Sequence, residues 1–231
     1  MKANYSLTDH KAEIEATQKE VSDFFGGIIP DFVKEGGWIL TDTVRFWRWT
    51  NQVNIIKKAK EKIEKSNLTK QQVPLKILSP ILENSSLEEE KIIQEKWSNL
   101  LANAITGQNE INPNYTEILK ELSSLEVTIL DKLFDATSQE TDYKKRKSMQ
   151  FSKEKIIEIF KISDEKSDLV IENLYRLNLC QPPASHGGVA IGKYPIMIRT
   201  NDFFEFTTFG YYFVKACKWD QSGVFLFPIH S

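Results

Sequence analysis

The sequence has few of the residues that bind metals or form disulfides, with three histidines and two cysteines in 231 residues. His10, His186 and His230 lie far apart and fit no zinc pattern, which needs three or four converging ligands. Cys180 and Cys217 form no CxxC pair, and we expect them to be reduced thiols. The sequence therefore predicts no metal site, no disulfide framework and no cofactor.

Long apolar segments are also missing. Residues 1–20 are polar, unlike a signal peptide, and no stretch has the roughly 18 uncharged apolar residues of a membrane span. The nearest candidate, Phe24–Leu40, contains Asp31, Lys34 and Glu35, and each charge is costly in hydrocarbon. This pattern predicts a cytoplasmic protein.

The chain shows neither an excess of one charge nor a catalytic motif. It has 30 basic and 32 acidic residues, so binding to nucleic acid would need a local basic patch. The glycines of HGGVAIG match neither GxGxxG nor a phosphate-binding loop, and no GxSxG occurs. We therefore expect a protein that is not an enzyme and has no small-molecule substrate.

Helical patterns dominate the first two thirds of the chain. Apolar residues recur at helical spacing up to about Lys65. Two Ser-x-x-Glu capping boxes, Ser86–Glu89 and Ser123–Glu126, predict helix starts, and Gly107 is expected to end the first of these helices. Between the long helical pattern and the first box, Val73–Leu82 is predicted to be an irregular or briefly helical connector.

The last third changes character. The polar segment Asp135–Met149 is predicted to be a loop, and Ser152 and Ser163 are predicted to cap two short helices. Tyr194–Arg199 and Phe203–Thr207 resemble the two strands of a hairpin, before a final helix at about 208–218. This order is that of a winged helix-turn-helix. The predicted fold is mainly α, with a helical domain at 1–110 and a winged-helix-like α+β domain at 111–231.

Candidate contact residues are cationic. The run at 144–147 could contact a nucleic-acid backbone or an anionic lipid head group, although a solvated loop is the plain alternative. The presumed recognition helix, Ser163–Leu177, carries four acids against two cations, which disfavours sequence-specific DNA reading. The RFWRW cluster at 45–49 is interpreted as a core anchor with arginines at its edge. The candidate residues are Arg45, Arg48, Lys144, Lys145, Arg146, Lys147, Lys193 and Arg199.

Several segments, taken together and in this order, resemble the abortive infection alpha family. They are EGGWILTDTVRFWRWTNQVNIIKKAKEKI, VPLKILSPILENSSLEEE, EKWSNLLANA and ILKELSSLEVTILDKL, with FTTFGYYFVKAC further on. The most specific piece is WSNLLANA, Trp97–Ala104, followed by Leu122 and Ser123. The resemblance implies a bacterial protein of phage defence. It implies no catalytic residues.

Three hypotheses follow. The first is a phage-defence protein that acts by binding, through a protein partner or self-association. The second is a nucleic-acid-binding regulator that uses the winged-helix-like part. The third is an effector active at a membrane surface, suggested by the apolar residues of Phe24–Leu40.

Overall fold

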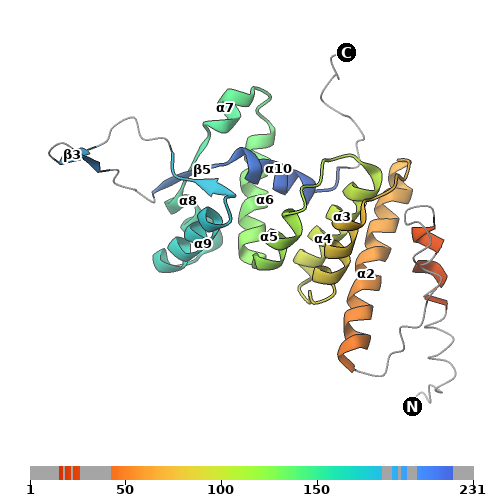
Figure 1. Ribbon diagram of the computed structural model, residues 1–231. Helices are drawn as coiled ribbons and strands as arrows, with labels where there is room; N and C mark the ends of the chain where they lie inside the picture. Colours follow the sequence, from red (N-terminus) through yellow and green to blue (C-terminus); the bar gives the residue numbers. More distant parts are fainter. Residues whose placement is uncertain are drawn as a thin grey trace. The chain divides into compact units, whose positions relative to one another are not determined.

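The chain forms two compact units, here called unit 1 and unit 2. Unit 1 comprises Met1–Glu121 and Ala216–Ser231, and unit 2 comprises Leu122–Lys215. The computed structural model (Figure 1) describes residues 16–17, 19–21, 23–26, 43–183, 189–191, 194–196 and 202–220, with side chains omitted at 43–46, 189–191 and 194–196. The predicted mainly helical fold is confirmed.

Unit 1 is built around one helix that is buried on nearly every side. Helix α4, Lys91–Thr106, packs against α2 (Thr43–Ser66), α3 (Leu75–Ser85) and α5 (Tyr115–Glu121). A helix that is buried all round occupies the centre of its layer. Its largest fully buried side chains are Trp97, Leu100, Leu101 and Ile105. The predicted end of this helix at Gly107, which has a left-handed φ of 68°, is confirmed.

Two asparagines of α4 bind backbone carbonyl groups of the C-terminal part of unit 1. Asn103 Nδ2 donates to the carbonyl oxygens of Ala216 at 2.7 Å and Lys218 at 2.8 Å. Asn99 Nδ2 donates to Cys217 O at 3.0 Å. These residues stand one helical turn apart, so both amides reach the same short segment. The two asparagines of the WSNLLANA sequence thus hold the C-terminal segment of unit 1 against α4.

The predicted capping box at Ser86–Glu89 is wrong. Helix α4 begins at Lys91 with Glu90 at its N-cap, and Ser86 instead ends α3. The Ser86 hydroxyl donates to Glu83 O at 2.6 Å and accepts from Arg48 Nε at 2.9 Å. A serine can satisfy either end of a helix, and its contact with α2 decided the outcome. The predicted connector is the helix α3, which continues through Pro80.

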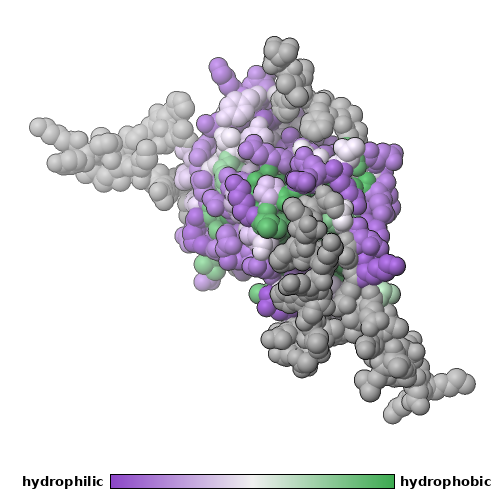
Figure 2. All heavy atoms as spheres, turned by 45° about the vertical axis from the view of Figure 1, so that its right-hand side comes forward, coloured by the Kyte–Doolittle hydropathy of each residue, from purple (hydrophilic) through white to green (hydrophobic). Residues whose placement is uncertain are grey.

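One face of the described residues is mostly polar. Hydrophilic side chains cover most of the face seen in Figure 2, with smaller hydrophobic areas between them. Among the described helices, none is long and apolar enough to span a membrane. Most of the apolar segment Phe24–Leu40 lies outside the described residues, but Phe24 and Phe25 are buried.

Unit 2 contains five described helices. They are α6 (Ser124–Ser138), α7 (Tyr143–Lys147), α8 (Lys153–Phe160), α9 (Asp164–Arg176) and α10 (Thr208–Ala216), whose last residue belongs to unit 1. The Ser123–Glu126 capping box is confirmed, since Glu126 Oε2 accepts from Ser123 N at 2.7 Å. Ser163 caps α9 by accepting from Lys166 N at 3.2 Å.

The predicted loop at Asp135–Met149 is wrong. Helix α6 extends to Ser138, and 143–147 form the helix α7. Asp142 starts α7, because its Oδ1 accepts from Lys145 N at 2.9 Å. The polar composition suggested a loop, but a capped single turn needs no apolar face.

The small sheets of unit 2 differ from the predicted hairpin. Strand β5 (Phe203–Phe206) lies between β1 (Gln150–Ser152) and β2 (Cys180–Gln181), antiparallel to both. Strand β4 (Tyr194–Ile196) pairs with β3 (Val189–Ile191) instead. The pairing of 194–199 with 203–207 is therefore wrong. Both partners of β5 come from earlier parts of the chain, and the burial of Phe204 and Phe206 makes β5 part of the core of unit 2.

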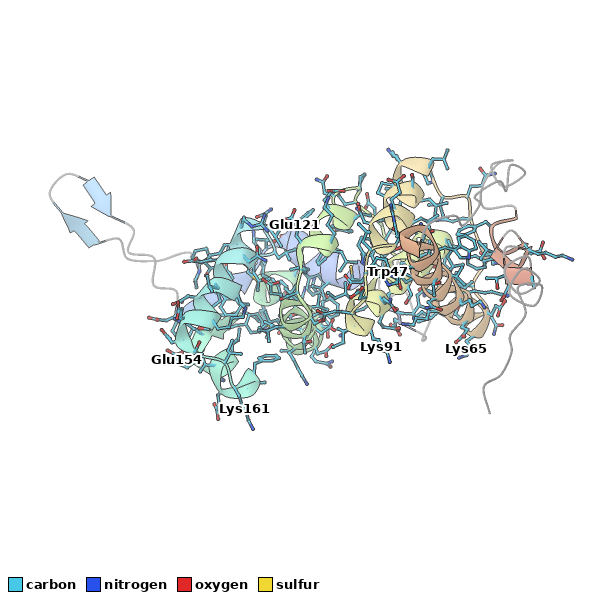
Figure 3. The ribbon with its side chains drawn as sticks, turned by 90° about the horizontal axis from the view of Figure 1, so that it is seen from below. Trp47, Lys65, Lys91, Glu121, Glu154 and Lys161 are labelled. Atoms are coloured by element: carbon cyan, nitrogen blue, oxygen red, sulfur yellow. The ribbon has the colours of Figure 1, made fainter. Side chains whose placement is uncertain are left out.

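Helices α8 and α9 are joined by an ion pair at their N-terminal ends. Helix α8 runs between the labelled Glu154 and Lys161 in Figure 3. Lys153 Nζ lies 2.6 Å from Asp168 Oδ1 and 3.0 Å from Asp164 Oδ1. The hydrogen bond from Lys153 to Asp168 raises the pKa of the lysine above its usual value, against the opposing effect of burial.

Candidate anion-binding surface

The basic run lies on one short helix of unit 2. The four cations of α7 are consecutive in sequence, and Lys144, Lys145 and Lys147 are exposed. No residue of α7 is buried, so this turn depends on its cap and its contacts rather than on core packing. The arrangement presents positive charge outward on a defined piece of backbone.

Tyrosine side chains hold α7 in place. Tyr143 Oη lies 3.1 Å from Thr208 Oγ1, within hydrogen-bond distance, and Arg146 Cζ stands 4.5 Å from the centroid of the Tyr211 ring. The Tyr211 ring in turn stacks on Phe134 at 4.9 Å. A guanidinium over a tyrosine face is attracted by the negative ring surface. These contacts link Arg146 to α10 and α6 within unit 2.

The positive charges influence one another. Burial lowers the pKa of Lys215, and the Arg146 charge lowers it further. Burial raises the pKa of Tyr211, while Arg146 acts in the opposite direction. In both cases the positive charge of Arg146 acts on a side chain of α10. A ligand with negative charge would relieve this repulsion.

Two nearby carboxylates are engaged by backbone groups. Asp142 caps α7, and Glu140 Oε1 accepts from Asp142 N at 2.9 Å. Across the part of the chain that the structure describes, no carboxylate forms an ion pair with Lys144, Lys145 or Lys147. The three lysine charges are thus not neutralised locally.

A shallow hollow lies beside α7 in unit 2. Two of the tyrosines that line it, Tyr143 and Tyr212, are 49% and 41% exposed. We call α7 and its neighbours Tyr211, Tyr212 and Lys215 the α7 surface. The hollow is lined by Thr137, Tyr143, Arg146, Lys147, Phe206, Thr207, Thr208, Tyr211 and Tyr212.

Among the predicted contact residues whose side chains the structure describes, the four of α7 lie together and Arg48 belongs to the other unit. Arg48 binds Ser86 within unit 1. The side chain of Arg45 and all of Lys193 and Arg199 lie outside the described residues, as do the three histidines. The sequence reading missed the tyrosines and Lys215. A tyrosine directly before KKRK, and the pair at 211–212 followed by Lys215, were the available signals.

The presumed recognition helix has a formal net negative charge. Within Asp164–Arg176 there are four acids and two cations, a formal net charge of −2. Lys153 pairs with Asp164 and Asp168, and the other charged side chains of the helix, Glu165, Lys166, Glu172 and Arg176, are exposed. This helix and α7 therefore differ in electrostatic character. In the described residues there is no group of three or more His, Cys, Asp or Glu side chains placed to hold a metal ion.

A family model described as abortive infection alpha matches residues 50–217, most of the chain. The chain belongs to the abortive infection alpha family. The resemblance noted in the sequence is thereby confirmed. Among curated proteins and solved structures, no match was found. The abortive infection alpha match includes α7, the tyrosines of α10 and the asparagines of α4, so these features lie within the family region.

Proposed function

We propose that this abortive infection alpha protein defends bacteria against phage by binding a partner rather than by catalysis. The family match over residues 50–217 carries the proposal, because it suggests phage defence. The cationic α7 surface supports a binding role, since it lies inside the matched region and, among the described residues, no carboxylate forms an ion pair with Lys144, Lys145 or Lys147. Cys180 and Cys217 are buried and are not joined in a disulfide, which supports a reducing, cytoplasmic location.

We also propose that unit 2 is a winged helix-turn-helix. The order α6, β1, α8, α9, β2, β5, α10 supports this, with the short helix α7 inserted between α6 and β1 and with β3 and β4 as the hairpin between β2 and β5. In this assignment α9 is the recognition helix. Its net charge of −2 disfavours docking into a DNA groove, so the binding role is assigned to the α7 surface.

The alternative of a membrane-surface effector has less support. It was suggested partly by Phe24 and Phe25, which are only 3% and 4% exposed. Lys70 Nζ lies 4.5 Å from the centroid of the Phe24 ring, which adds a polar cover. Two of the apolar residues that were expected to reach lipid are therefore used inside unit 1.

Phage plating tests the defence role. Cells that carry the gene should lower the efficiency of plating of at least one phage in a broad panel by about tenfold or more. Lys144→Gln with Lys147→Gln should restore plating, whereas Lys155→Gln with Lys166→Gln, exposed lysines of α8 and α9, should not. Equal plating with and without the gene across the whole panel would refute the defence role.

A further inference from the structure

The α7 surface combines two features with which proteins hold single strands: a group of cations and exposed aromatic rings. We propose that this surface binds single-stranded nucleic acid, with phosphates at Lys144 and Lys147 and bases against the tyrosines. The proposal deepens the proposed function by naming the ligand, and it rests on that function for the role of the contact in defence.

The charge of α7 indicates a polyanion. Lys144 and Lys147 are three residues apart on one helix, so their Cβ atoms lie about 5–6 Å from each other. Neither has a carboxylate partner among the residues that the structure covers, in contrast to Lys62, which lies 2.7 Å from Glu95. A ligand with regularly repeated phosphates would bring several anions to this turn at once.

The tyrosines indicate bases that are free to stack. Tyr143 and Tyr212 line the same hollow, and about half or somewhat less of each residue is exposed. Arg146 lines the same hollow and stands over the Tyr211 ring, so the hollow also presents a positive charge. Bases in a duplex are already stacked on one another, whereas those of a single strand offer their faces to aromatic side chains.

Duplex DNA fits this arrangement poorly. The helix that would enter a groove, α9, has a net charge of −2, and Figure 1 shows α8 and α9 on the opposite side of the β5 sheet from α7. A duplex docked on α9 would therefore lie away from the lysines of α7. A single strand of nucleic acid that binds across α7 would not need to contact α9.

A lipid surface also fits poorly. Helices that lie in a membrane interface combine a basic face with a broad apolar one. Helix α7 has the sequence YKKRK and is only five residues long. It offers no aliphatic side chain to insert among acyl chains, so its chemistry suits soluble phosphates and bases better.

Fluorescence anisotropy with the full-length protein tests the proposal. The probes are labelled 15-nucleotide oligo(U) and oligo(dT), and a duplex of the same length. Both single strands should bind at 50 mM salt. If about four phosphates are contacted, the affinity should fall about 50-fold by 200 mM. The duplex should bind several-fold more weakly.

Three variants separate charge from stacking. Lys144→Gln with Lys147→Gln should lower the slope of log affinity against log salt by about 1.4, since each phosphate contact contributes about 0.7. Tyr143→Ala should weaken binding about tenfold without changing that slope, and Tyr143→Phe should retain most of it. Lys155→Gln with Lys166→Gln is the matched control, with two exposed lysines removed elsewhere in unit 2.

Several outcomes would overturn the proposal. These are absent binding at 50 mM salt, equal loss in the control variant, tighter binding of the duplex, or binding to anionic phosphatidylglycerol vesicles but not to the oligonucleotides. If plating shows defence while the oligonucleotides do not bind, this inference fails and the defence role stands. If the oligonucleotides bind as expected while plating is unchanged, the defence role fails instead. Thermal melts confirm that each variant is folded.

Discussion

One amide group, the side chain of Asn103, binds two carbonyl groups at the end of the family region. Asn103 is fully buried and bonds to Ala216 O and Lys218 O. Asn103→Ala leaves both carbonyls without this donor, so we expect the free energy of unfolding to fall by about 2–3 kcal/mol. Urea denaturation measures this loss. Asn54→Ala, at an exposed position of α2, is the control and should change stability by less than about 0.5 kcal/mol.

Two glycines should respond differently to a methyl group. A Cβ on Gly210 would overlap the carbonyl oxygen of Leu179, which is backbone and cannot turn aside. On Gly107 it would meet only the flexible end of Gln71, with strain from the φ of 68°. We expect Gly210→Ala to cost about 3 kcal/mol or more and Gly107→Ala about 1 kcal/mol. Thermal melts that give the reverse order would contradict the close contact at Gly210.

Helix starts were predictable from sequence only in part. The two Ser-x-x-Glu patterns look alike, yet only Ser123 caps a helix, because Ser86 is bonded to Arg48 from α2. We expect Ser123→Ala to lower the free energy of unfolding by about 1 kcal/mol, and Glu89→Ala to have almost no effect. Chemical denaturation of both variants checks this. A similar loss in Glu89→Ala would mean that the first box forms after all.

Local patterns predicted helices well and strand partners poorly. The buried face of α4 and the end at Gly107 follow from periodicity and from backbone preference, which depend on near neighbours. Strand β5 pairs with residues about 50 positions earlier, and nothing in Phe203–Phe206 names that partner. The α7 surface was half predictable for the same reason: KKRK is contiguous, whereas its tyrosines at 211 and 212 come from a distant helix.

The ion pair that Lys153 of α8 forms with Asp164 and Asp168 of α9 should weaken only at high pH. Hydrogen bonding to Asp168 raises the pKa of Lys153 in the folded protein. The ion pair therefore stabilises the fold fully at a pH below the pKa of a lysine in the unfolded chain, about 10.4. This stabilisation is lost as the pH rises through the pKa of Lys153 in the folded protein. We expect Lys153→Gln to lower the free energy of unfolding by up to about 1 kcal/mol between pH 6 and 10. Urea titrations should show the difference shrinking above pH 10.5. A difference that grows there would contradict the ion pair.

Each unit carries one buried thiol, so the opening of each unit can be measured by the rate at which its cysteine is labelled. Cys217 in unit 1 and Cys180 in unit 2 are 3% and 2% exposed, and burial raises the pKa of Cys180. We expect slow labelling of both by a thiol reagent in the native protein. Asn103→Ala should accelerate labelling at Cys217 alone, because its contacts flank that residue.

Mass spectrometry of the labelled peptides separates the two sites. Asn54→Ala serves again as the control and should leave both rates unchanged. Equal acceleration at Cys180 would show that the units open as one body, contrary to the expectation.

Helix α7 has only five residues, and this limits how tightly the α7 surface can bind an anion. A single capped turn without buried residues belongs to the least protected part of a fold, and it opens and closes far more often than a core helix. An anion that bridges Lys144 and Lys147 links residues almost one turn apart and favours the closed form. Ordering the turn then offsets part of the attraction, so we expect an anion held at α7 to dissociate quickly.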